Sequence, residues 1–247
     1  QAFTKNDLPS QSTSGVDNVE HLWVTNFPAG GYAIGVTGDG AETYGLAFDA
    51  VPSPLISISG LDTNAAESGP DGAAFLIRRD GSSELATTVI LQTSGTASNG
   101  ADYAFPASAV FAPGQSAVTS ILQTVADEIA EGPETATISI APGVGYLISS
   151  TNEATALIAD RPFDQWRFEN FTAEELADPT ISGDAGDPDG DGGNIIDYAS
   201  GDAPKIFNPD LLGQPGTVSD GGIPYLSLTF FRRPQPSDVT DIIEVSD

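Results

Sequence analysis

The chain has 247 residues and a formal net charge of -27, from 35 acidic and 8 basic residues. Nucleic acids and anionic lipid surfaces are bound by clustered lysine and arginine, so this balance excludes both as expected partners. The basic pairs Arg78-Arg79 and Arg232-Arg233 are expected on solvent-facing strand surfaces. Glycine and proline number 27 and 18, and such a composition is typical of many short strands joined by turns.

Several classes of protein are excluded by what the sequence lacks. No apolar run approaches the roughly 20 residues of a membrane-spanning helix, so no membrane insertion is expected. The absence of cysteine excludes disulfides, thiol catalysis and cysteine-ligated zinc, which leaves packing or a hard cation to rigidify the fold. Because the chain contains no methionine and opens with Gln1, we expect it to be part of a longer polypeptide.

The first 50 residues have the pattern of a partial β-domain. Two short apolar runs, at 22–27 and 32–36, are separated by the turn-forming sequence Pro28-Ala29-Gly30-Gly31, and this arrangement predicts a hairpin. A third apolar run lies at 44–48. We expect residues 1–50 to be the closing strands of a truncated β-domain, followed by a linker at 51–55.

Residues 56–161 alternate between strand and turn signals at spacings of about 8 to 15 residues. The clearest period-two alternation of apolar and polar residues lies at 135–140. These features predict a mainly β protein built around an antiparallel β-sandwich.

The sequence changes character after Arg161-Pro162. Thr172 to Leu176 reads as a capping box at the start of one short helix, which we place in an Asp-rich region at 162–200. The aromatic residues Trp166, Phe168 and Phe171 are expected in a small core rather than on a sugar-binding surface. Strand patterns return at 225–231 and 242–245, so residues 201–247 are expected to form a truncated C-terminal β-segment.

Five motifs in the predicted sandwich resemble the Calx-beta family. They are Phe75-Leu76-Ile77-Arg78-Arg79-Asp80-Gly81, Gly95 to Tyr103, Phe111-Ala112-Pro113-Gly114-Gln115, Asp127 to Glu134, and the closing Ile158-Ala159-Asp160. The resemblance covers about residues 56–160 and implies an immunoglobulin-like sandwich. It also implies a Ca²⁺ site at one end of the sandwich, with ligands at Glu67, Asp102, Asp127, Glu131, Glu134 and Asp160.

Elementary electrostatics supports a cation at such a tip. Two carboxylates 4 Å apart repel by roughly 4 kcal/mol at an effective dielectric constant near 20, unless a cation lies between them. Calcium accepts six to eight oxygen ligands in flexible geometry. This chain departs from the family pattern at Ala126 and Arg161, where acidic residues are common, so the affinity and a second ion are in question. The alternative is a solvated acidic tip that binds no ion.

A second candidate site is the sequence Asp187-Pro188-Asp189-Gly190-Asp191-Gly192. Carboxylates at the first, third and fifth positions, with glycine at the sixth, match the start of a twelve-residue calcium loop. Tyr198 stands where such a loop has its bidentate acid, and Asp197 precedes it with a shorter arm than glutamate. The region resembles calcium-loop segments near the C-termini of large secreted bacterial proteins. A flexible acidic linker is the alternative.

No catalytic group is evident. The single histidine, His21, lies beside Trp23 in an apolar run and is expected to be structural, and no Gly-x-Ser-x-Gly motif is present. Acidic residues abound, but the sequence singles out no glycosidase pair. We therefore expect a fragment without enzymatic activity.

The N-terminal region resembles the closing strands of the β-domain that follows the catalytic domain in some secreted subtilisin-like proteases. This resemblance implies a parent that is secreted or on the bacterial cell surface. The expected function is a noncatalytic, calcium-stabilised accessory module that spaces and rigidifies the flanking domains of the same polypeptide. The alternative is an adhesion module that binds an extracellular protein or glycan.

Overall fold

The structure is a computed structural model that describes residues 2–5, 8–11, 33–35, 52–69, 71–234, 238–240 and 242. At the N-terminus, β1 (Ala2–Lys5), β2 (Leu8–Gln11) and β3 (Ala33–Gly35) form an antiparallel sheet in the order β2-β1-β3. The turn of the predicted hairpin, the predicted strand at 44–48 and His21 lie outside the described residues.

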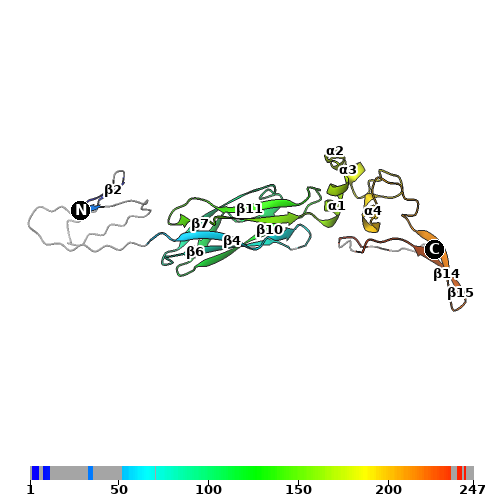
Figure 1. Ribbon diagram of the computed structural model, residues 1–247, viewed down its shortest axis with the longest axis horizontal. Coiled ribbons are helices and arrows are strands. Elements are labelled where there is room, and N and C mark those ends of the chain that lie inside the picture. The colour runs from blue at the N-terminus through cyan, green and yellow to red at the C-terminus, as the bar shows by residue number, and fades with distance from the viewer. Residues whose placement is uncertain are drawn as a thin grey trace, which may run out of the picture.

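The central part of the chain is a β-sandwich of two five-stranded sheets, as the sequence predicts (Figure 1). Its strands are β4 (Leu55–Asp62), β5 (Asn64–Ala66), β6 (Ala73–Asp80), β7 (Thr87–Gly95), β8 (Tyr103–Ala104), β9 (Ser108–Phe111), β10 (Ala117–Thr124), β11 (Glu134–Ile140), β12 (Leu147–Ile148) and β13 (Glu153–Ala159). One sheet has the order β12-β4-β6-β10-β8 and the other β5-β13-β11-β7-β9.

The core lies between the two sheets and follows from the alternation of side chains along each strand. In β11, Ala136, Ile138 and Ile140 are buried while the intervening residues are partly exposed, which confirms the period-two prediction. Phe75 and Phe105 meet edge to face in the same core. This continuous apolar layer holds the two sheets face to face, so strand ends from both sheets meet at each tip of the sandwich.

Two strand pairs depart from the antiparallel pattern. The short strand β12 runs parallel to the start of β4, and β5 runs parallel to the end of β13. In the second pair, Ala65 lies opposite Ile158 and Ala66 lies opposite Ala159. The residues that follow these two strands, Glu67 and Asp160, therefore emerge side by side at one tip of the sandwich.

Arg79 corrects one expectation from the sequence. Arg78 is exposed as expected, but Arg79 is only 3% exposed. Its guanidinium donates to the carbonyl oxygens of Ser83, Leu85, Ala112 and Gln115 and to the hydroxyl of Thr87. It also lies over the ring of Phe111, 5.1 Å from the centroid. Alternate side chains of β6 point into the sandwich, and Arg79 is the last of these. It lies at the tip opposite the acidic residues, where buried carbonyl oxygens of the loops need hydrogen-bond donors.

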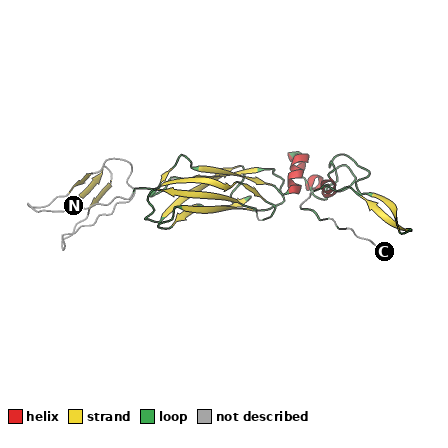
Figure 2. Cartoon of the chain, turned by 60° about the horizontal axis from the view of Figure 1, so that its bottom comes forward, coloured by secondary structure: helices red, strands yellow, loops and turns green. Residues whose placement is uncertain are grey.

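Four short helices follow the sandwich, where the sequence indicates one (Figure 2). They are α1 (Pro162–Asn170), α2 (Ala173–Leu176), α3 (Pro179–Ser182) and α4 (Asn194–Ser200). The predicted capping box is confirmed, because Thr172 and Glu175 bond to each other's backbone N–H at the start of α2. Proline at the first helical position favours α1 and α3. The prediction of one helix used the capping box and did not use these prolines.

Aromatic residues form the small core of the helical region. Trp166, Phe171 and Tyr198 are buried together, as expected for the first two. The expectation was wrong for Phe168, which is 44% exposed and lies outside this core, with its ring against Gly132 of the sandwich.

The last described elements are β14 (Gln214–Asp220) and β15 (Ile223–Thr229), which form an antiparallel hairpin. Of the second predicted strand, at 242–245, Ile242 has no strand structure, and the other residues lie outside the described part of the chain. In the described part of the chain, none of the helices has the length and apolar character needed to cross a membrane.

Candidate metal centres

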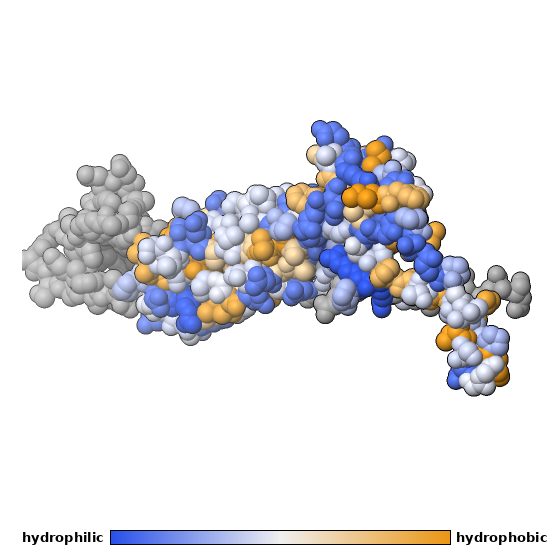
Figure 3. Space-filling model, turned by 45° about the vertical axis from the view of Figure 1, so that its right-hand side comes forward, coloured by the Kyte–Doolittle hydropathy of each residue, from blue (hydrophilic) through white to orange (hydrophobic). Residues whose placement is uncertain are grey.

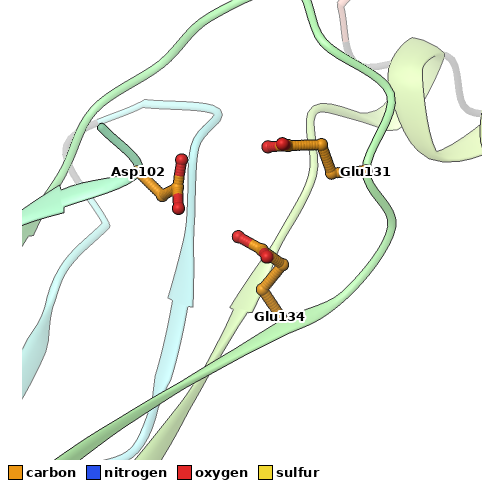
Figure 4. Close-up of side chains that lie close together, drawn as sticks. All are labelled: Asp102, Glu131 and Glu134. Atoms are coloured by element: carbon orange, nitrogen blue, oxygen red, sulfur yellow. The ribbon is translucent and has the colours of Figure 1, made fainter. Parts of the chain in front are cut away.

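The first centre lies at the tip of the sandwich that faces α1. Three carboxylates converge there from separate segments: Asp102 precedes β8, Glu131 lies in the loop before β11, and Glu134 begins β11. One carboxylate oxygen from each lies within 4.8 Å of the other two. Figure 4 shows the three side chains pointing toward one another across the gap between these segments.

Two further carboxylates are buried beside this group. Glu67 is 4% exposed, and its Oε2 atom has no hydrogen-bond partner among the described residues. Asp160 is also buried, and its Oδ2 atom accepts hydrogen bonds from the backbone N–H groups of Glu131 and Gly132, at 3.1 and 2.7 Å. Asp160 therefore anchors the loop that presents Glu131.

The sixth predicted residue, Asp127, lies in the same loop but outside the group of three. Its Oδ1 atom accepts the N–H of Ile129 at 2.8 Å, so part of its capacity is used within the loop. Its charge still reaches the site, since it contributes to the raised pKa of Glu67. All six predicted residues are thus at one tip, in an inner set and a neighbouring set.

Burial and the crowding of negative charge raise the pKa values of carboxylates at this tip. Burial, followed by the charges of Asp160 and Asp127, raises the pKa of Glu67 to about 7. Burial, followed by the charge of Asp102, raises the pKa of Glu134 to about 7. A buried carboxylate without a nearby cation favours its protonated form, whereas a cation at the tip would favour the ionised form.

The second centre is the Asp-rich loop before α4. Asp187, Asp189 and Asp191 each offer a carboxylate oxygen within 4.8 Å of the others. The Oδ1 atom of Asp187 accepts the N–H groups of Gly190, Asp191 and Gly192, at 2.7, 3.1 and 3.3 Å, which closes the loop. Gly190 has φ of 88°, a conformation that favours glycine and allows the tight turn.

Asp197 in α4 is a further carboxylate near this second group. It is 1% exposed, and neither of its carboxylate oxygens has a hydrogen-bond partner in the described part of the chain. Both oxygens of Asp189 and Oδ1 of Asp191 are also buried and unpaired there. Burial, followed by the charges of Asp189 and Asp191, raises the pKa of Asp197 to about 7. Five unpaired buried oxygens are costly unless a cation binds them.

The structure adds Asn194, which the sequence analysis did not assign as a ligand. Its amide nitrogen donates to the carbonyl oxygens of Ile181 and Gly183, at 2.7 Å each, and this pair of bonds fixes the orientation of the amide. The Oδ1 atom is buried and has no partner among the residues described. The sequence does contain one indication of this position: Asn194 and Asp197 are three residues apart, and residues three apart on a helix share a face.

Helix α1 connects the two centres. Asp164 is fully buried and forms ion pairs with Arg161 and Arg167, at 2.6 and 2.8 Å. Arg167 also donates to the carbonyl oxygen of Glu128 in the sandwich loop and to that of Ser182 at the end of α3. The helix therefore holds the acidic loop on one side and the helical region on the other.

No family model and no curated protein matches the sequence. Among solved structures, CBD12 from CALX1.2 is similar over 43% of this chain, with 20% identity and a TM-score of 0.37. The apo-form Calx CBD1 domain is similar over 42% of this chain and 96% of its own length, with 23% identity and a TM-score of 0.36. The chain spans 45% of the CBD12 structure.

Proposed function

We propose that the chain is a noncatalytic, calcium-binding β-sandwich module of a secreted bacterial protein. The observation that carries the proposal is the burial of unpaired carboxylate oxygens at two places, above all both oxygens of Asp197 and one of Glu67. Each such group is unfavourable in a folded protein that contains no cation, and favourable when a cation binds it.

Calcium is the ion that suits both sets of ligands. Every candidate ligand is a carboxylate or amide oxygen, and the chain has no cysteine to bind a softer metal. Calcium takes six to eight oxygens in flexible geometry, whereas magnesium needs a tighter octahedron and keeps several waters. Ligands that come from several loops, as at the sandwich tip, favour the more flexible ion.

The role of the ions is to stabilise the tip and the joint with α1. At the sandwich tip an ion would hold together the ends of β5, β11 and β13, and at the second centre it would fix the Asp-rich loop to α4. At ten times its dissociation constant, each ion adds about 1.4 kcal/mol to the free energy of unfolding. The module would thereby space flanking domains, and a secreted protease is the parent we favour.

The test compares the melting temperature of the whole chain in chelator and in millimolar calcium. Calcium is expected to raise the melting temperature of the natural sequence. Asp197→Asn is expected to weaken binding at the second centre by about tenfold or more, because it removes a ligand charge, while in chelator it should not destabilise the chain. Asp80→Asn, at an exposed end of β6, is the matched control and should respond to calcium like the natural sequence.

Two results would contradict the proposal. One is a melting temperature that does not change between chelator and millimolar calcium. The other is an Asp197→Asn variant whose calcium titration by calorimetry is indistinguishable from that of Asp80→Asn.

A further inference from the structure

The hairpin β14–β15 leaves a large apolar surface uncovered. The exposed apolar residues of the hairpin and the segment after it are Val218, Ile223, Tyr225, Leu226, Leu228, Phe230 and Phe231. Leu226 is 92% exposed. Figure 3 shows apolar residues on this projecting part of the molecule. An isolated two-stranded hairpin is marginally stable in water, and apolar surface of this kind marks an interaction site.

The turn of the hairpin determines which backbone groups face outward. Gly221 and Gly222 both have positive φ, at 61° and 84°, as in a two-residue turn that suits a hairpin. Asp220 and Ile223, which flank the turn, are therefore a hydrogen-bonded pair, and such pairs alternate along the ladder. It follows that Leu226 and Leu228 direct their N–H and C=O groups away from β14, toward the open edge of β15.

Proline restricts how that edge can pair with another strand. Pro224 also faces the open edge and has no N–H to donate, whereas Leu226 and Leu228 each offer a donor and an acceptor. We consider an antiparallel pairing in which the N–H and C=O groups of both leucines bond to the partner, and neither leucine lies opposite a proline. This pairing places Leu226 opposite Leu228 of the partner subunit. Four leucine side chains then lie on one face, and the two-fold axis passes through Ser227.

Charge identifies the occupant that fits this edge. Between 211 and 231 the only charged residue is Asp220, and Arg232-Arg233 follow directly. In a chain with a net charge of -27, this is the stretch that a second acidic copy can approach with little repulsion. The edge pairing also brings the Asp220 end of one hairpin toward the arginine end of the other.

We propose that two copies of the chain associate through antiparallel pairing of their β15 edges, which converts two hairpins into one four-stranded sheet. The interface is the same surface on both copies, as in a two-fold symmetric dimer. It forms independently of the proposed calcium sites, so it is tested in saturating calcium and again in chelator, and its failure would leave the calcium proposal unaffected.

The experiment uses the absence of cysteine from the chain. In the proposed register Ser227 lies opposite Ser227 of the partner subunit as a non-hydrogen-bonded pair, about 4.5 Å apart between Cα atoms. That separation is within the range of a disulfide. Under mild oxidation, Ser227→Cys is expected to form dimers at least about tenfold faster than Ser219→Cys, because pairing raises the local thiol concentration to the order of millimolar. Ser219 lies on the outer edge of β14 and is the matched control.

Light scattering on the natural sequence provides the second measurement, with a dimer expected at tens of micromolar and a monomer for Leu226→Lys. A monomer at all concentrations would overturn the proposal, and so would equal cross-linking of Ser227→Cys and Ser219→Cys. Slow hydrogen exchange at Leu226 and Leu228 in a monomeric sample would also overturn it, since another part of the same chain would then cover the edge.

Discussion

At the scale of single residues, Arg79 and the acidic tip show opposite solutions to buried polar groups. Arg79 is a buried cation whose N–H donors bond to carbonyl oxygens of two loops next to its strand and to the hydroxyl of Thr87. The buried carboxylates Glu67 and Asp197 have oxygens that find no donor among the described residues. The oxygens at one tip of the sandwich are therefore paired by a side chain of the protein, whereas at the acidic tip Glu67 keeps an oxygen that is unpaired within the described part of the chain, as Asp197 does in α4.

Arg79→Lys tests the first of these solutions. A lysine ammonium offers three donors without the planar geometry of guanidinium, so it leaves loop carbonyls unpaired and loses the contact with Phe111. We expect a decrease of about 2 to 4 kcal/mol in the free energy of unfolding, measured by urea denaturation. Arg78→Lys, one residue away and exposed, is the control and should change stability by less than about 0.5 kcal/mol. Equal effects of the two substitutions would refute the role assigned to Arg79.

At the scale of elements, the contact between α1 and the acidic loop depends on a glycine. Gly132 has φ of 77°, and an added Cβ atom there would lie 2.6 Å from Cε1 of Phe168. A side chain at this position would thus force the ring of Phe168 to move from its place against the loop that presents Glu131. The docking of the helix and the geometry of the first metal centre are linked through one backbone position.

Gly132→Ala is expected to destabilise the chain more than Gly114→Ala. Gly114 has a similar φ of 82° but no atom within 4 Å of the added Cβ, so it isolates the conformational cost of about 1 kcal/mol. The clash with Phe168 should bring the cost at Gly132 to about 2 to 3 kcal/mol, measured by thermal or chemical unfolding. If the two variants have the same stability, the contact between Phe168 and Gly132 does not hold the helix.

Also at this scale, the elements differ in how far the sequence predicts them. The alternation at Ala136, Ile138 and Ile140 and the capping box at Thr172 are local signals, and the structure confirms both. The parallel pairing of β5 with β13 joins segments about 90 residues apart, and a local pattern does not encode it. For the same reason the burial of Arg79 was missed, since its acceptors come from two loops beyond its own strand.

The candidate site residues also differ in how far the sequence predicts them. The residue types and spacing indicate the Asp187, Asp189 and Asp191 group, which the structure brings together within one loop. The tip residues come together because strand ends meet there, and their assignment came from a family resemblance. Asn194 was missed because a spacing of three residues from Asp197 is a weak signal in the sequence, whereas its burial and fixed amide single it out in the structure.

At the scale of the whole molecule, the crowded carboxylates make stability depend on pH. In the metal-free protein the pKa values of Glu67, Glu134 and Asp197 are raised to about 7. The folded state thus binds more protons than the unfolded state between pH about 4 and about 7. The contribution of these groups is fully present below that window and is lost as the pH rises through it.

In chelator, the melting temperature is therefore expected to be higher at pH 5 than at pH 7.5. In saturating calcium the difference should shrink or reverse, because the ion binds the ionised form and competes with protons. Differential scanning calorimetry at the two pH values, with and without calcium, provides the measurement. A metal-free protein that is more stable at pH 7.5 than at pH 5 would contradict the assigned pKa shifts.

The parallel pairing of β5 with β13 has a mechanical consequence. The chain enters the sandwich at β4 and leaves it after β13, and these two points lie at opposite ends of the sandwich (Figure 1). Tension along the polypeptide pulls β5 and β13 in opposite directions along their length, so their hydrogen bonds are loaded together in shear rather than opened one after another. Glu67 and Asp160 follow these strands directly, and an ion shared between them would reinforce the contact that bears the load.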